Sequence, residues 1–438
     1  MRGINPEWDR RRDTLRTNLW FVPTIEVLAA VAVFVLTYGL DRATFRGEFG
    51  IPSWVIGGTP DAARQVLTAI AAAIITVVGV VFSITIVALT LASTQFGPRM
   101  LRNFIRDRGT QVTLGTFVAT FVYTVATLVV VGPEFVPHIS TTVAIASLVL
   151  DLVVLIYFIN HIAQEIQLPR VIAGIARDVS IAAAAYTDGT AQGTGIETGP
   201  SAAELLVLMA ESGGPVRTAT SGYLQYIRYE QLVNIAEKAD AVIHLPYRPG
   251  HFLTEGQVMA MVWPASAAEV VAVKLDRGHV AGPTRTLTQD ISFGIDQLVE
   301  IALRALSLAV NDTFTVMTCI DWLGDCLSRL AVSWDPAPVR RCRSGQIRVI
   351  AEQVSYERLV QRSFEKIRQA GIGMPAIMIR QLDALTQIMD RTSAPERQQV
   401  LLDQAEMIER SVADSVPEQS DRDDILRRCQ ALRERITA

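Results

Sequence analysis

The chain has 438 residues, of which 50% are hydrophobic and 19% are charged. In soluble proteins about a quarter of all residues are usually charged, so this composition indicates that part of the chain lies in lipid. The net charge of −4 argues against a large basic surface for nucleic acid, and no nucleic-acid partner is expected. Charges are sparse between residues 19 and 166 and ordinary beyond residue 170, which predicts a membrane part followed by a soluble part.

Four long apolar runs lie in the first 170 residues. We expect membrane-spanning helices at residues 19–40, 65–94, 111–131 and 141–162. Each run covers the roughly 20 residues that a helix needs to cross about 30 Å of hydrocarbon. The first run is longer than the apolar part of a signal peptide and contains Pro23 and Glu26. We therefore interpret it as a retained helix in a domain that extends over residues 19–170.

The arginines predict the orientation of these helices. Residues 1–18 form a basic tail, whereas the segment GPEFVPHIS between the third and fourth runs contains no basic residue. The loop between the second and third runs carries Arg99, Arg102, Arg106 and Arg108. The positive-inside rule then places both termini in the cytoplasm. Apolar residues among the loop arginines predict a basic amphipathic helix that contacts anionic lipid at the inner leaflet.

Hydroxyl groups recur on the second and third spans at helical spacings, so they fall near one face of each helix. The candidate pathway residues are Thr76, Ser83 and Thr90 on the second span and Thr116, Thr120 and Thr124 on the third. Such faces favour tight helix packing, and in an oligomer they can also line a hydrated pathway.

Asp151 lies in the middle of the fourth span, where a carboxylate is costly. An ion or proton site and a buried polar anchor between helices both account for it. Glu26 and His161 lie near the cytoplasmic ends of their spans, and we interpret both as structural polar residues.

The rest of the chain predicts an α+β region in the cytoplasm. Residues 171–215 are typical of a helical connector and a flexible linker, and residues 289–438 favour amphipathic helices, with Asp312 as an N-cap. Residues 216–288 predict a β-rich module. Its strand candidates are 220–227, 241–248, 257–263 and 269–275, with a helix at 229–240. The segment RPGHFLTEGQVMAMV resembles barrel-sandwich domains, but it lacks the lysine to which biotin or lipoate would be attached.

No nucleophile elbow, P-loop, dinucleotide fingerprint or metal motif is present, so neither an enzymatic activity nor a cofactor is predicted. An enzyme would need clustered polar residues in the soluble part. The candidates for such a cluster are His244, His251, His279, Asp290 and Asp312. The four cysteines form no CxxC pair, which favours reduced thiols in a core.

Several long stretches together resemble the bacterial DUF2254 family of predicted membrane proteins. They include ITVVGVVFSITIVALTLASTQFGPRMLRNFIRDRG, FINHIAQEIQ, SGYLQYIRYEQL, RTLTQDISFGIDQLVEIALRALS and NDTFT. The resemblance implies a four-helix membrane part with a cytoplasmic domain in the bacterial inner membrane, and it implies no particular activity. The chain departs from the family pattern near Leu308 and Ala309, where a glycine or proline is expected, and at Thr313, where a proline is expected.

Two functions agree with these patterns. In the first, the protein is an oligomeric channel or transport-type protein, in which Asp151 and the hydroxyl faces form a pathway that the cytoplasmic domain controls. In the second, it is a membrane-anchored sensor or scaffold whose cytoplasmic part binds a protein or a ligand. We favour the first.

Overall fold

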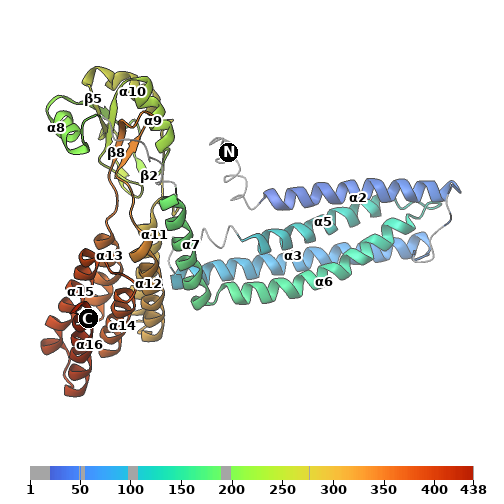
Figure 1. Cartoon of the computed structure of the whole chain (residues 1–438). Helices are drawn as coiled ribbons and strands as arrows, with labels where there is room; N and C mark the ends of the chain where they lie inside the picture. The colour runs from blue at the N-terminus through green and yellow to red at the C-terminus, as the bar shows by residue number, and fades with distance from the viewer. Residues whose placement is uncertain are drawn as a thin grey trace. The chain divides into compact units, whose positions relative to one another are not determined.

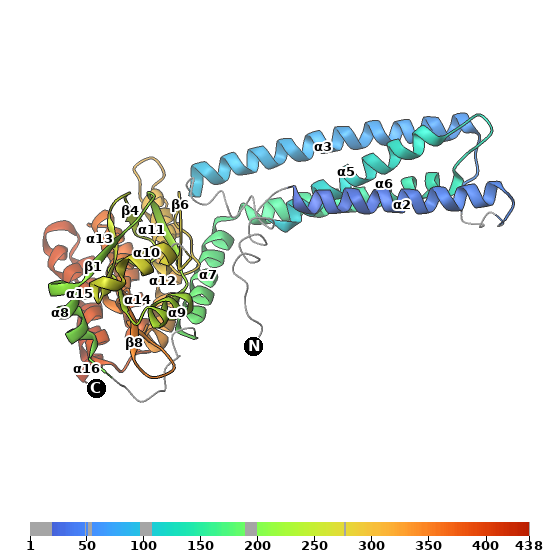
Figure 2. The same cartoon turned by 90° about the horizontal axis from the view of Figure 1, so that it is seen from above.

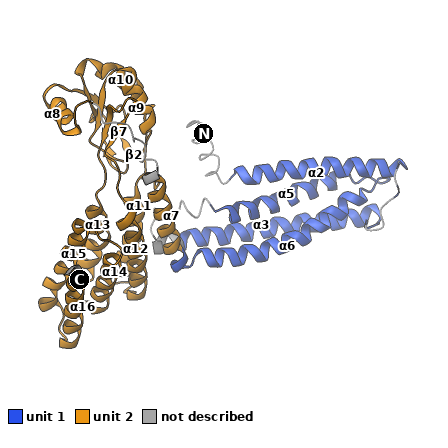
Figure 3. Ribbon diagram, in the orientation of Figure 1, with its two compact units in different colours: residues 1–170 blue, residues 171–438 orange. Residues whose placement is uncertain are grey.

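The computed structural model describes residues 20–48, 50, 55–96, 107–188, 199–275 and 277–437 (Figure 1). The chain divides into two compact units, Met1–Arg170 and Val171–Ala438 (Figure 3). We call them the membrane unit and the C-terminal unit and describe each by itself.

The membrane unit contains four long helices. They are α2 (Phe21–Phe45), α3 (Pro60–Phe96), α5 (Arg108–Val130) and α6 (His138–Glu165). Among the described residues, these four are the helices that are long and apolar enough to cross a membrane. The four predicted spans are therefore confirmed, although most of the helices extend beyond the predicted ends.

Helix α5 is the central member of this bundle, because it packs against α2, α3 and α6. Half of its most apolar window is buried, compared with at most 17% in the other three helices. Figure 2 shows the four helices running alongside one another. Their shared core includes Leu67, Ile74, Val81, Phe117 and Phe158. A single copy of the bundle therefore leaves most of α2, α3 and α6 to face lipid or other protein.

The C-terminal unit contains two small sheets. The larger one has the order β1 (Gly214–Arg217), β5 (Val258–Trp263), β3 (Val242–Leu245), β8 (Ile347–Ala351) and β7 (Val339–Arg341). Its neighbours are antiparallel except β3 and β8, which are parallel. The smaller sheet has the order β4 (Phe252–Leu253), β2 (Gly222–Ile227) and β6 (His279–Gly282).

Two details of the predicted β-rich module differ from the structure. Residues 269–275, predicted as a strand, belong to helix α10 (Ala268–Leu275), which follows the short η2 (Ala265–Ala267). The prediction was wrong because Val271 and Leu275, four residues apart, are buried on one helical face while the intervening Val273 is exposed. Strands β7 and β8 complete the larger sheet from a segment that was predicted to be wholly helical.

The segment that resembles a barrel-sandwich domain is divided between the two sheets, since it contributes β4 to one and β5 to the other. The mixed α and β character of the unit is confirmed, and the barrel-sandwich resemblance is not.

The other long helices lie before, between and after the strands in the chain. They are α7 (Leu168–Asp188), α8 (Ala202–Ser212), α9 (Tyr229–Lys238), α11 (Ile291–Ala305), α12 (Thr313–Ser333), α13 (Tyr356–Ala370), α14 (Pro375–Met389), α15 (Pro395–Ser415) and α16 (Gln419–Thr437). The predicted N-cap is present, because the Asp312 carboxylate accepts a hydrogen bond from the Thr315 backbone N–H at 3.1 Å.

Helix α7 packs onto α11 and α12. The Cys326 thiol lies 3.5 Å from the Ala176 carbonyl oxygen. Gly294 leaves room for Val179, whose Cγ2 atom would lie 2.2 Å from a Cβ at this position. The rings of Tyr186 and Trp334 stack with their centroids 5.5 Å apart. These contacts align α7 parallel to α12.

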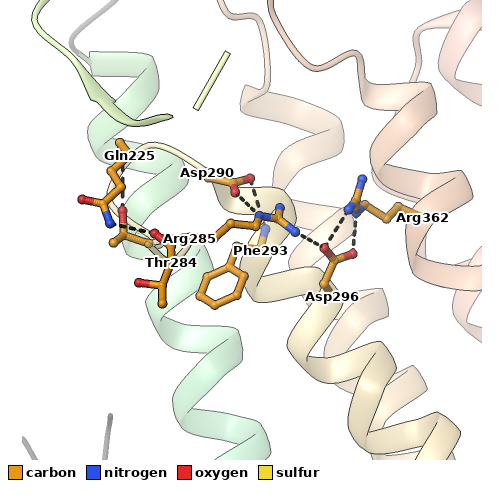
Figure 4. A network of polar contacts seen from close by, with 8 residues as sticks. Gln225, Thr284, Arg285, Asp290, Phe293, Asp296 and Arg362 are labelled. Carbon is orange, nitrogen blue, oxygen red and sulfur yellow. Dashed lines mark hydrogen bonds and ion pairs between the residues drawn. The ribbon is translucent and has the colours of Figure 1, made fainter. Parts of the chain in front are cut away.

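An arginine–aspartate network joins the segment after β6 to α11 and α13 (Figure 4). Arg285 bonds Asp290 at 2.7 Å and Asp296 at 2.6 Å, and Arg362 donates two hydrogen bonds to Asp296. Asp290 also caps α11 through the Phe293 N–H, and the Arg285 guanidinium lies over the Phe293 ring. The network connects the β-rich part to the helical part of the unit.

Candidate functional site: a polar seam between α5 and α6

Asp151 is buried between helices near the midpoint of α6. Its residue is 3% exposed. One carboxyl oxygen, Oδ1, accepts a hydrogen bond from the Thr120 hydroxyl of α5 at 3.2 Å. The other oxygen, Oδ2, is buried and has no partner within the described part of the chain. A half-satisfied carboxyl group at this depth is costly.

The end of α6 that contains His138 holds a second buried carboxylate, Asp41 of α2. Its oxygens accept hydrogen bonds from the Ile139 N–H at 2.8 Å, the Ser140 N–H at 3.0 Å and the Ser140 hydroxyl at 2.7 Å. A carboxylate suits the start of a helix, because the free N–H groups and the helix dipole both favour negative charge there. Asp41 is thus fully engaged, in contrast to Asp151.

Hydroxyl groups lie between these two carboxyl groups. Tyr123 of α5 donates to the Ser140 carbonyl oxygen at 3.3 Å, and its oxygen lies 2.9 Å from the Thr37 hydroxyl of α2. Thr124 and Thr127 are fully buried and donate to the carbonyl oxygens one turn earlier in α5. The interior of the bundle is therefore hydroxyl-rich from Thr120 to Ser140.

The opposite end of the seam holds a histidine–aspartate pair. Asp107 caps α5 and accepts hydrogen bonds from the Thr110 N–H and hydroxyl, each at 2.8 Å. The same carboxylate lies 2.8 Å from His161 Nε2 of α6. Gly109 makes this approach possible, since a Cβ there would lie 2.5 Å from His161 Nε2.

We call the set Asp41, Tyr123, Ser140, Thr120, Asp151, His161 and Asp107 the polar seam. Along α6, Asp151 is about 15 Å from His161 and about 16 Å from Ser140, at 1.5 Å per residue. Titratable side chains therefore stand at both ends and at the middle of the α5–α6 contact.

Glu26 lies outside the seam, on the α2 side of α5. It packs over Gly115, where a Cβ would lie 1.8 Å from Glu26 Oε2. That oxygen is buried and has no partner among the described residues. The sequence predicted Glu26 to be a structural polar residue near the end of its span, and the structure directs its side chain at the neighbouring helix α5.

The two predicted hydroxyl faces do not meet in one chain. Thr120 and Thr124 are buried inside the bundle, and Thr116 donates to the Val112 carbonyl oxygen. By contrast Thr76, Ser83 and Thr90 lie on the exposed face of α3. The pathway residues on α5 thus belong to the polar seam or flank it, whereas those on α3 face outward.

The structure does not describe most of the arginines that were predicted to contact lipid. Arg99, Arg102 and Arg106 lie outside the described residues, so their role stays a prediction. Arg108 is exposed at the first residue of α5.

The candidate residues for a catalytic cluster have separate local roles. His251 Nδ1 accepts from the Arg248 N–H at 3.4 Å, and His279 Nδ1 lies 2.9 Å from the Leu275 carbonyl oxygen. His244 lies in β3, and burial lowers its pKa. Asp290 and Asp312 are helix caps. Within the described ranges no group of three or more His, Cys, Asp or Glu side chains could hold a metal ion.

Sequence reasoning missed Asp41 and Asp107, because both lie just outside the predicted spans 19–40 and 111–131. A signal existed for Asp41: Pro137 at the N-cap position of α6 forms no side-chain cap. A helix that lacks its own cap needs a partner from elsewhere.

Comparison with known proteins agrees with this architecture. A family model described as "Predicted membrane protein (DUF2254)" matches residues 16–387. Uncharacterized proteins from Mycobacterium bovis and Mycobacterium tuberculosis are 29% identical to the chain over 421 residues, which cover 94% of this chain and 79% of theirs. No solved structure matches the chain. With four membrane-length helices and a family match over most of its length, the chain belongs to the DUF2254 family of predicted membrane proteins.

Proposed function

We propose that this protein is a transport-type membrane protein that moves protons along the polar seam, with Asp151 as the group that is protonated and deprotonated at mid-membrane. The observation that carries the proposal is the state of Asp151. It is buried at the middle of α6, has one hydrogen bond, and has an oxygen with no partner among the described residues. Intramembrane carboxyl groups of this kind recur in proton relays.

The ends of the seam support the same reading. Asp107 and His161 form a hydrogen-bonded pair at one end, and such a pair can exchange a proton with water. Asp41 and Ser140 stand at the other end, with Tyr123 and Thr120 as hydroxyl donors between them and Asp151. Gaps of about 15 Å are too long for direct transfer, so transient water molecules must complete the relay.

Two further features belong to the proposal. The protein sits in the bacterial inner membrane with both termini in the cytoplasm, as the arginine distribution favours. It forms a homo-oligomer through the exposed face of α3, where small residues such as Ala72, Thr76 and Gly79 would allow close approach.

The C-terminal unit would control transport through α6. Two residues, Ile166 and Gln167, separate α6 from α7, and α7 is packed onto α11 and α12. A ligand or protein that shifts α7 would therefore act directly on the helix that carries Asp151.

The test is proton flux in liposomes that contain the purified protein and a pH-sensitive dye. A potassium gradient with valinomycin supplies the driving voltage. We expect this voltage to change the internal pH of liposomes that contain wild type faster than that of empty liposomes, Asp151→Asn to abolish the difference, and Asp151→Glu to retain part of it. Asp61→Asn is the matched control, because Asp61 is 88% exposed at the start of α3, and it should leave the flux unchanged.

The proposal fails if wild type behaves like empty liposomes, or if Asp151→Asn conducts as well as wild type. In the first case, capture of a defined cytoplasmic protein or ligand by the full chain would favour the sensor or scaffold function instead.

A further inference from the structure

One face of α5 carries a buried row of threonines that a phenylalanine interrupts. The residues of this row recur at spacings of three or four, so they project from the same side of the helix. They are Thr113, Phe117, Thr120, Thr124 and Thr127, and each is at most 6% exposed. Thr120 donates its hydrogen bond to Asp151 of α6, so this face is the one that forms the polar seam. Phe117 therefore places a ring where its neighbours in the row place hydroxyl groups.

The facing side of α6 changes character at Asp151. Before this residue, the side chains that recur at spacings of three or four are small, and they belong to Ser140, Ala144 and Ser147. After it, the side chains in the same series are large and apolar, and they belong to Leu155, Phe158 and Ile162. Helix α6 is thus small or hydroxylated toward the Asp41 end of the seam and bulky toward the His161 end.

The half of the seam between Asp151 and Asp41 is lined by hydroxyl groups on both helices. Thr124 follows Thr120 on α5 by four residues, which is about 6 Å along the helix. Tyr123 then reaches the Ser140 carbonyl oxygen, and Ser140 bonds Asp41. Because a hydroxyl group can both donate and accept, this half can hold water in a chain of hydrogen bonds.

The half between Asp151 and His161 is blocked by two aromatic rings. Phe117 lies about 4.5 Å along α5 from Thr120, toward Asp107, and Phe158 lies about 10.5 Å along α6 from Asp151, toward His161. Both side chains are at most 1% exposed and belong to the shared core of the bundle. A phenylalanine ring has no N–H or O–H donor and no oxygen acceptor, so it breaks a chain of hydrogen bonds.

The polar lining resumes beyond the first ring. Thr113 lies about 6 Å along α5 from Phe117, again toward Asp107. It is 1% exposed, and its buried hydroxyl group has no hydrogen-bond partner among the described residues. A buried hydroxyl group without a protein partner is a position that water commonly occupies. Polar groups that can hold water therefore stand on both sides of the rings.

We infer that Phe117 and Phe158 form an apolar gate, which in this conformation separates Asp151 from the His161–Asp107 pair and leaves it connected to the Asp41 end. Apolar constrictions of this kind close a pathway by excluding water. The inference deepens the proposed function, since it rests on Asp151 as the group that exchanges a proton. It gives that group one open side, and movement of the rings would open the other.

The experiment measures how fast the Asp151 carboxyl group exchanges its proton for deuterium, which requires access of water but no net transport. The full-length protein in liposomes is transferred from H₂O to D₂O buffer at a pH at which Asp151 is protonated. Infrared spectroscopy follows the shift of the carboxyl C=O band that Asp151→Asn lacks. Thr124→Val and Thr113→Val form a matched pair, because each removes one buried hydroxyl group from the same face of α5, on opposite sides of Thr120.

We expect Thr124→Val to slow the exchange several-fold and Thr113→Val to leave it unchanged, because only the Asp41 half is open. Adding Phe117→Thr to Thr124→Val should restore the rate, since the row of hydroxyl groups then continues past the gate. Adding Phe117→Val, which leaves a side chain of the same size without a hydroxyl group, should not restore it.

Equal exchange rates for Thr124→Val and Thr113→Val would overturn the gate, as would slower exchange in Thr113→Val alone. Equal effects of Phe117→Thr and Phe117→Val would also overturn it, because the change would then come from lost packing. Proton flux is measured on the same liposomes. Absence of flux together with the expected exchange rates would refute proton transport while supporting the gate, so the two failures are distinguishable.

Discussion

Asp41 of α2 caps the first turn of α6 through Ser140. The carboxylate accepts hydrogen bonds from both the backbone N–H and the hydroxyl of Ser140, at 3.0 and 2.7 Å, and a third from the Ile139 N–H. The cap is supplied by a different helix, so it joins two helices that are distant in sequence. This makes Asp41 a structural residue as well as one end of the polar seam.

We expect Asp41→Ala to destabilise the membrane unit by about 2 kcal/mol, because a helix cap and buried charge-assisted hydrogen bonds are both lost. The measurement is thermal unfolding of the purified protein in detergent. Asp61→Ala is the control, since Asp61 is 88% exposed at the start of α3. Equal unfolding temperatures for the two variants would show that the cap contributes little.

Gly115 and Gly39 provide a matched pair of substitutions. Gly115→Ala should separate α2 from α5, because a Cβ would lie 1.8 Å from Glu26 Oε2 and 2.9 Å from the Pro23 Cα. Gly39→Ala in α2 should be neutral or slightly stabilising, since nothing lies within 4 Å of its Cβ position and alanine is the better helix former. Thermal unfolding in detergent distinguishes the two. An unchanged unfolding temperature for Gly115→Ala would contradict the close packing of α2 against α5.

Asp296 gives the C-terminal unit a pH dependence. Burial alone would raise its pKa, but hydrogen bonds and charge from Arg362 and Arg285 outweigh burial and hold the pKa below its ordinary value. This stabilisation is complete above the unfolded-state pKa of about 3.9 and is lost as the pH falls through the lower folded-state pKa.

We therefore expect Asp296→Asn to destabilise the unit by about 2–4 kcal/mol at pH 7, and the difference from wild type to shrink below about pH 4. The stabilities of the variant and of wild type are measured by tryptophan fluorescence during heating. Asp325→Asn, which breaks an exposed pair with Arg329, should change stability by less than about 1 kcal/mol. A difference for Asp296→Asn that persists at low pH would refute the role of its charge.

The four cysteines should differ in reactivity. Burial raises the pKa of Cys319 and of Cys326 to about 12, and that of Cys429 to about 11. Burial also acts on Cys342, but hydrogen bonds from Ser344 and Arg348 outweigh it and lower the pKa. Since the thiolate is the reactive form, we expect iodoacetamide to label Cys342 first at pH 7.5. Mass spectrometry of the peptides identifies the cysteine that is labelled first. Labelling of Cys319 before Cys342 would contradict the predicted order of reactivity.

The sequence predicted the membrane architecture well, because apolar runs of membrane length have few other physical explanations. Asp151 stood out for the same reason, as a carboxylate in an apolar run. Asp41 did not, because its role depends on a helix that begins nearly a hundred residues later and carries proline at its own cap position.

Predictions failed where one local pattern fitted two structures. Residues 269–275 are rich in valine, which favours a strand, yet tertiary packing of Val271 and Leu275 makes them a helix. The exposed position of Thr76 and Ser83 was likewise invisible, since periodicity groups residues on a face without saying which neighbour that face meets.

The pairing of β3 with β8 has a consequence for how the protein is made. Ile243 lies opposite Val349, and α10, α11 and α12 are synthesised between them. During translation, the edge of β3 that later pairs with β8 therefore stays unpaired while these helices emerge from the ribosome. Unpaired edges attract other strands, and contacts distant in sequence form slowly. Destabilising β7 or β8 should thus reduce the yield of folded protein through aggregation of nascent chains.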